Sequence, residues 1–188
     1  MKSMHWMLAS LLLLICTGTA SAQVDKATAA LTASAVVDWW VSNAEAHVMP
    51  VLEAMPEARY SFAPTNGEFN GVRTFAEQGK HLAANNYRMA AKMLGEKPTA
   101  DQENERGPDS VKTKAEITVY VGGSFAALHK AVADMDAANE VTPLSGTSGT
   151  WQRTRLGLAI DAVAHSFDHY GQMVEYLRMN GIVPPDSR

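Results

Sequence analysis

Hydrophobic and polar positions divide the chain into four long segments separated by polar stretches. Within each segment the apolar residues recur with the spacing of an amphipathic helix. No alternating pattern of the kind that marks a strand competes with this periodicity. The pattern predicts an all-α four-helix bundle, with helices over about residues 27–54, 72–94, 112–138 and 151–180.

Turn-forming and polar residues mark the three connections between these helices. Residues 56–71 are rich in Pro, Asn and Gly, residues 95–110 have almost no apolar side chains, and residues 141–150 are again polar. Gly122 and Gly123 are the weakest point of the third helix, because an interior glycine costs about 1 kcal/mol relative to alanine.

The N-terminus has the pattern of an export signal. Lys2 precedes a short apolar run over residues 8–16, and Ala20-Ser21-Ala22 is a small-residue cleavage site. We therefore expect a cleaved signal peptide over residues 1–22, a folded domain over residues 23–188, and a periplasmic or secreted location. No other segment is apolar for about 18 consecutive residues, so we expect no stable membrane insertion.

Composition then narrows the chemistry. The 188 residues carry 16 Lys+Arg against 20 Asp+Glu, a net charge of −4, which argues against nucleic acid as a partner. The single cysteine, Cys16, lies in the predicted signal. The rest of the chain therefore has no thiolate for a metal, a disulfide or a nucleophile, and imidazole is its strongest candidate for binding a metal.

Two histidines are four residues apart on the last predicted helix. His165 and His169 share one face there, a geometry by which two imidazoles can chelate one ion, although a solvated face gives the same spacing. Their neighbours on that stripe include Ala162 and Met173 rather than Lys and Glu, which favours a semi-polar cavity. An apolar arc on the other side of this helix predicts contact with the bundle core or with a second subunit, hence a homodimer. The arc consists of Leu156, Ile160, Val163, Phe167, Tyr170, Val174 and Leu177.

A third histidine, His81, lies on the second predicted helix, away from that helix's main apolar face. A solvated histidine would have the same pattern. Glu77 is four residues earlier on the same face, so it can orient the imidazole, bind a metal itself, or form an ordinary surface pair. The sequence leaves open whether Glu77 or His47 joins a metal site, and it favours a structural or solvent role for His129.

Residues 74–83 and 165–178, followed by 180–185, resemble the DinB-like (DinB/YfiT) metalloprotein family. The resemblance implies a four-helix bundle in which His81, His165 and His169 hold a divalent ion, most often zinc or nickel. It further implies an enzyme similar to thiol S-transferases that use small thiols as cosubstrates, or to metal-dependent isomerases and hydrolases. If this member is exported, a thiol that occurs only in the cytosol would not be available to it as a cosubstrate.

Polar residues near the three histidines are the candidates for catalysis and substrate binding. An ion held there would activate a thiol or a water molecule. The alternatives are a non-catalytic metal-binding or interaction bundle, and a scaffold that holds no metal. The catalytic candidates are Glu77, Asp168 and Tyr170, and the substrate-binding candidates are Asn85, Gln172 and Tyr176.

Overall fold

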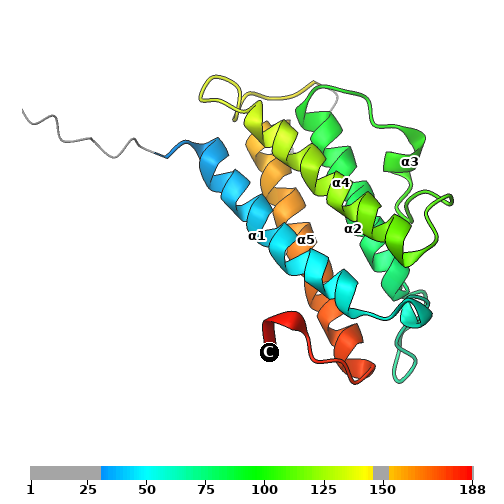
Figure 1. The fold of residues 1–188 in the computed structure, drawn as a ribbon. Helices are drawn as coiled ribbons and strands as arrows, with labels where there is room; N and C mark the ends of the chain where they lie inside the picture. Colours follow the sequence, from blue (N-terminus) through cyan, green and yellow to red (C-terminus); the bar gives the residue numbers. More distant parts are fainter. Residues whose placement is uncertain (1–30, 146–152, 188) are drawn as a thin grey trace, which may run out of the picture. The chain divides into compact units, whose positions relative to one another are not determined.

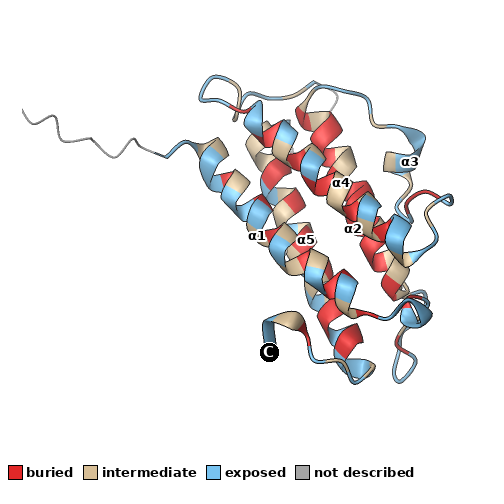
Figure 2. Ribbon diagram, in the orientation of Figure 1, coloured by how far each residue is buried: buried red, intermediate tan, exposed pale blue. Residues whose placement is uncertain are grey.

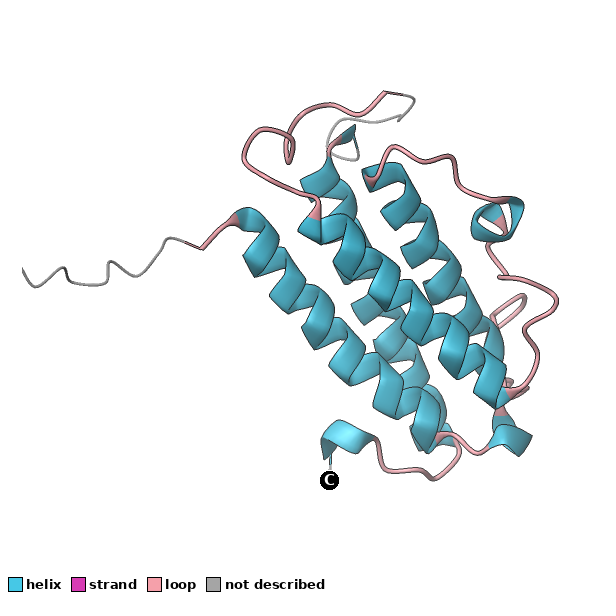
Figure 3. Ribbon diagram, turned by 45° about the horizontal axis from the view of Figure 1, so that its top comes forward, coloured by secondary structure: helices cyan, strands magenta, loops and turns pink. Residues whose placement is uncertain are grey.

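The computed structural model describes residues 31–145 and 153–187, and within these ranges it has helices and no strand (Figures 1 and 3). The all-α prediction is confirmed: four long helices and one short α-helix form the domain. The predicted signal peptide lies outside the described residues. The helices are α1 (Ala33–Ala54), α2 (Phe75–Met93), α3 (Ala100–Glu103), α4 (Lys114–Ala133) and α5 (Arg155–Met179), with single 3-10 turns at Glu57–Arg59 and Pro185–Ser187.

The four long helices pack side by side, and α1 and α2 each contact both α4 and α5. In Figure 1, α2 and α4 run in the same direction, and α1 and α5 run in the opposite one. The long connection over residues 94–113, which contains α3, returns the chain along α2 so that α4 can run parallel to it (Figure 3). This topology places α2 antiparallel to α5, and the candidate histidines lie on these two helices.

A threonine caps the N-terminus of each long helix. Each threonine hydroxyl accepts a hydrogen bond from a backbone N–H three residues later, which satisfies one of the free donors of the first turn. Glu77 and Glu116 complete capping boxes at α2 and α4. The second and third helices therefore begin two or three residues later than predicted. The caps are Thr32, Thr74, Thr113 and Thr154.

The predicted C-terminal end of the third helix, at residue 138, is wrong. Helix α4 ends at Ala133, because the side chains that follow bond to the backbone in a turn. Asp136 Oδ1 accepts hydrogen bonds from the backbone N–H groups of Ala138 and Asn139, both at 2.9 Å. Asn139 Oδ1 accepts one from Asp136 N at 3.0 Å. Such local bonds compete with the helix.

The two glycines in the middle of α4 do not interrupt it. A Cβ at Gly123 would collide with the hydroxyl of Tyr87 on α2, so the missing side chain is what admits this ring. The propensity cost of glycine in a helix is thus offset by close packing of α2 against α4.

The core is apolar, except along the line where α2 meets α5. Figure 2 shows the buried residues on the inward faces of the long helices. Among the described residues, seven polar side chains are buried, and only Ser124 does not come from α2 or α5. None of the helices in the described ranges is long and apolar enough to cross a membrane. The other six buried polar residues are Gln78, His81, Asn85, Asn86, Ser166 and His169.

The apolar arc of the last helix is less buried than its composition suggests. Val174 and Leu177 are buried in the core, as predicted, whereas Val163 is half-buried against α1 and Ile160 is 54% exposed. The stripe that carries the histidines is the more deeply buried of the two, with Met173 fully enclosed.

Candidate metal centre

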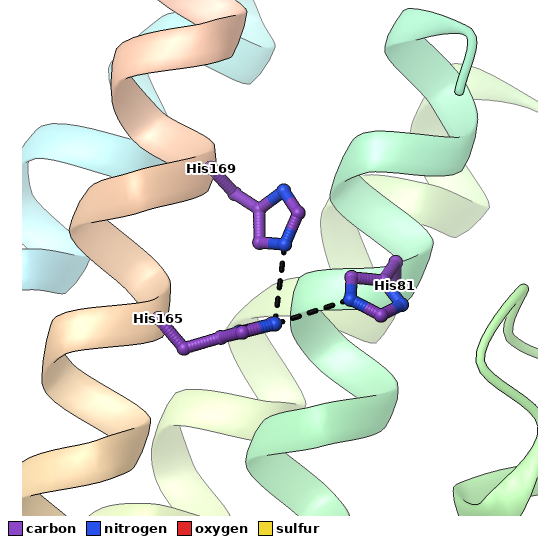
Figure 4. A group of neighbouring side chains, drawn as sticks. All are labelled: His81, His165 and His169. Atoms are coloured by element: carbon purple, nitrogen blue, oxygen red, sulfur yellow. Dashed lines mark hydrogen bonds between the residues drawn. The ribbon is translucent and has the colours of Figure 1, made fainter. Parts of the chain in front are cut away.

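Three imidazoles from α2 and α5 converge on one point (Figure 4). The Nε2 atom of His165 lies 3.1 Å from Nε2 of His81 and 3.1 Å from Nε2 of His169. One ligand atom of each residue falls within 4.8 Å of the other two. His81 and His169 are 8% and 5% exposed, and His165 is half-buried. The structure therefore brings together the three histidines that the sequence selected.

Hydrogen bonds fix the tautomer of two of these rings. His81 Nδ1 lies 2.6 Å from the backbone carbonyl oxygen of Glu105, and His169 Nδ1 lies 2.6 Å from Oε1 of Gln78. Both partners are acceptors, so both Nδ1 atoms carry the proton. Each Nε2 is then left with a lone pair, and both lone pairs are directed at the common point.

The orientation of Gln78 itself is set by a chain of amide groups that ends at a carboxylate. Asp168 Oδ2 accepts a hydrogen bond from Gln172 Nε2 at 3.0 Å, and Gln172 Oε1 accepts one from Gln78 Nε2 at 2.8 Å. Because an ionised carboxylate can only accept, each amide in the chain has one consistent orientation. In this orientation Gln78 Oε1 accepts a hydrogen bond from Nδ1 of His169. Polar groups orient metal-binding histidines in the same way in known metal sites.

The donor set fits a divalent cation. His165 Nε2 has at most one hydrogen to give, so at least one of its two 3.1 Å contacts has no hydrogen between the two nitrogens. A cation at that point would accept all three lone pairs. The second nitrogen of His165, Nδ1, is buried and has no hydrogen-bond partner in the described part of the chain.

The electrostatics of the group also suit a metal. Burial is the main cause that lowers the pKa of all three histidines, and the pKa falls to about 3 for His165 and about 4 for His169. The neighbouring imidazoles add to the effect on His165. The rings are therefore neutral near pH 7, the form in which imidazole binds Zn²⁺ or Ni²⁺.

Three of the six candidate polar residues lie close to this group. Gln172 and Asp168 belong to the amide chain behind His169. The charge of Asp168 acts on His165, raising its pKa against the larger effect of burial. Asn85 is one helical turn from His81, is 4% exposed, and accepts a hydrogen bond from Arg88.

Two of the other three candidates, Glu77 and Tyr170, have partners away from the three histidines. Glu77 caps α2 through Thr74 and lies 3.7 Å from Arg106, so it does not orient His81. The hydroxyl of Tyr170 donates to Asp186 in the C-terminal turn.

Tyr176, the last of the candidates, is buried, and its hydroxyl donates to the backbone oxygen of Arg73 at 2.9 Å. A second, longer contact joins that hydroxyl to Gln78 Nε2 at 3.4 Å, so Tyr176 supports the amide chain from behind.

The remaining histidines of the described residues lie outside the group. His47 Nδ1 is 2.7 Å from the backbone oxygen of Asn43, and its Nε2 is 3.6 Å from Asp186. His129 bonds to Asp38 at 2.6 Å on the face between α1 and α4. His47 and His129 therefore have local partners of their own.

Sequence reasoning missed the two groups that orient the rings. Gln78 was visible only as a polar neighbour of His81, and its contact with His169 joins residues 91 positions apart. The carbonyl of Glu105 lies in the polar connection over residues 95–110, and no side-chain pattern could have indicated a backbone atom.

The structure is thus an all-α bundle in which a three-histidine group that could hold a metal ion lies between two antiparallel helices. The sequence model of the DinB superfamily matches residues 41–173, which include all three histidines, and the chain belongs to that superfamily. A search of curated proteins gives no match.

Proposed function

We propose that this chain is a divalent-metal protein in which His81, His165 and His169 hold zinc or nickel for a metal-dependent transferase or hydrolase reaction. The observation that supports the proposal most strongly is the aim of the ring nitrogens: two tautomers are fixed by acceptors behind the rings, and their lone pairs converge. Three nitrogen ligands with a place for one further ligand are typical of catalytic rather than structural zinc sites. When bound, the ion supplies Lewis acidity that activates water or a thiol.

The protein groups around the histidines perform the remaining tasks. Gln78 and the Glu105 carbonyl orient two of the three rings, so that their Nε2 lone pairs are directed at the place of the ion. Asp168 is exposed and its charge acts on His165, which suits it to accept or return a proton beside the site. A small thiol is one cosubstrate of the proposed transferase reaction. We further propose that the protein works in the periplasm or outside the cell.

Kinetic assays separate catalysis from simple binding. Zinc-loaded and nickel-loaded protein would be assayed with thiols plus electrophiles and with panels of esters and amides. We expect activity that is lost in His81→Ala and reduced about 100-fold in Asp168→Asn, the lower range for a general acid or base. Glu175→Gln, an exposed carboxylate on the same helix that pairs with Arg178, is the matched control and should keep full activity.

Two outcomes would count against catalysis. Activity that survives in His81→Ala would remove the three histidines from the reaction. Stoichiometric metal without turnover on any panel would favour the alternative, a non-catalytic metal-binding bundle.

A further inference from the structure

Besides His81, helix α2 carries two neighbouring polar side chains, Asn85 and Arg88, that have hydrogen-bond donors without a partner in the described residues. Asn85 is 4% exposed, and its Nδ2 atom has no partner within the described residues. Arg88 Nη2 donates to Asn85 Oδ1 at 2.7 Å, and Arg88 Nε is buried without a partner. Both atoms without a partner are N–H donors. A buried donor left unpaired loses its hydrogen bond to water without replacement, so such a pair calls for an explanation.

The pair lies next to the histidine group. Asn85 follows His81 by four residues, which places the two side chains on one face of α2, one turn apart. Burial is the largest cause that lowers the pKa of His81 and His165, and the charge of Arg88 contributes to both shifts. Arg88 follows His81 by seven residues, about two turns of α2, and it is only half-buried, so a ligand can reach it.

Arg88 forms no ion pair with a carboxylate of the described residues. The described residues contain seven ion pairs within 4.0 Å, and Arg88 is in none of them. The carboxyl group whose titration it influences is Asp161 on α5, one turn before His165. Burial raises the pKa of Asp161, and the charge of Arg88 lowers it in part. Within the described residues, the positive charge of Arg88 therefore has a hydrogen bond to Asn85 but no ion-pair partner.

We propose that Asn85 and Arg88 form an oxyanion subsite that binds the carboxylate or phosphate group of a small-molecule substrate whose reacting atom is placed at the three histidines. The inference rests on the proposed function, since it names the substrate class for the same site. An arginine fork matches the planar oxygens of such a group, and the free Asn85 amide hydrogen can donate to the same group. Charge-assisted bonds of this kind give both affinity and orientation.

Two thiols of similar size provide the test. Cobalt-loaded protein would be titrated with 3-mercaptopropionate and with 2-mercaptoethanol, following the thiolate-to-cobalt absorption at equal thiolate concentrations. We expect the charged thiol to bind about 10-fold more tightly, from the strength of hydrogen bonds to charged groups. That preference should disappear in Arg88→Gln and persist in Arg178→Gln, an exposed arginine paired with Glu175.

Asp161→Asn should increase the affinity for the charged thiol, whereas Arg88→Gln should lower it. Removing this carboxyl group takes away a competitor for Arg88, so the affinity for 3-mercaptopropionate should rise several-fold while that for 2-mercaptoethanol stays the same. Competition with acetate and with inorganic phosphate then distinguishes a carboxylate subsite from a phosphate subsite.

A metal-free arm keeps the inference separate from the metal proposal. Isothermal titration of succinate and inorganic phosphate into the metal-free chain should show binding that Arg88→Gln abolishes. Protein that binds no cobalt would contradict the proposed function, whereas cobalt-loaded protein with equal affinity for both thiols would contradict the subsite. Succinate and phosphate binding that is absent, or unchanged in Arg88→Gln, would also overturn it and leave ordered water as the partner of the two donors.

Discussion

Helix α5 makes two very different contacts with its neighbours. Towards α2 it presents buried polar groups joined by hydrogen bonds. In one of these bonds, His169 Nδ1 lies 2.6 Å from Gln78 Oε1. Towards α1 it presents apolar side chains, and an open groove of about 520 Å³ with a mostly apolar lining lies between the two helices. This α1/α5 groove is lined by Leu31, Thr32, Ala33, Val36, Val37, Trp40, Leu156, Ile160, Val163 and Ala164.

The contrast teaches that hydrophobicity alone does not locate the interior of this bundle. Ile160 is 54% exposed, whereas His169, four residues after His165 on the same helix, is 5% exposed. Burying polar rings is favourable only when their hydrogen bonds are provided, and Gln78 and the Glu105 carbonyl provide them. The α2/α5 contact thus encloses a three-histidine group that could hold a metal ion.

The largest effect should come from metal binding to the α2/α5 contact. Zinc at 1,000 times its dissociation constant should stabilise the folded protein by about 4.1 kcal/mol, because the unfolded chain lacks the site. Thermal unfolding with and without zinc measures this. His165→Ala should remove the shift and His129→Ala should keep it; an equal shift in both variants would place the ion elsewhere.

The next effect tests the orientation of His169. Gln78→Met removes the acceptor of the Nδ1 proton while keeping a side chain of similar length, and metal affinity should fall about 10- to 100-fold. Gln78→Glu retains an acceptor oxygen and should restore most of the affinity. Competition titration with a chromophoric chelator measures both constants, and equal affinity in Gln78→Met and the parent would show that the hydrogen bond is irrelevant.

In metal-free protein, the α2/α5 contact should make the free energy of unfolding depend on pH, whereas the apolar α1/α5 contact should not. The folded pKa values of His165 and His169 lie at about 3 and about 4, below the ordinary 6.5, so the unfolded chain binds more protons. The free energy of unfolding should therefore fall as the pH drops from 6.5 to 5, by about 1.4 kcal/mol for each pH unit and each histidine at most.

Urea unfolding at several pH values measures that slope. His165→Ala/His169→Ala should have a flatter profile over the same window, even though the variant is less stable overall. A slope unchanged by the double substitution would mean that other groups take up the protons.

The smallest effect on folding is expected at the α1/α5 groove. The exposed apolar side chains there are the surface that a homodimer would bury, and we expect a dimer in solution. Ile160→Glu should shift the mass found by light scattering to that of a monomer, with metal affinity unchanged and monomer stability within about 0.5 kcal/mol. Parent protein that is already monomeric at micromolar concentration would contradict the dimer, whereas loss of metal on Ile160→Glu would show that the two contacts are coupled.

The sequence predicted the architecture and the pair His165 and His169 from local spacing, whereas His81 was assigned to the site by the family resemblance. Periodicity fixed the helices, and the four-residue spacing of His165 and His169 put two rings on one face. It could not predict that Gln78 would bond His169, since that contact requires the register of α2 against α5. It also left open whether each residue of the apolar arc meets the core or a second subunit, because a helical wheel does not say which neighbours a helix meets.

Metal content is the most direct test of the central claim, that the three imidazoles form a divalent-metal site. Protein purified without an affinity tag would be analysed for zinc, nickel and other transition metals, beside His81→Ala and His165→Ala/His169→Ala. The account predicts close to one ion per chain in the parent protein and a large loss in both variants. Parent protein that is metal-free, and that also fails to bind added zinc or nickel, would contradict it.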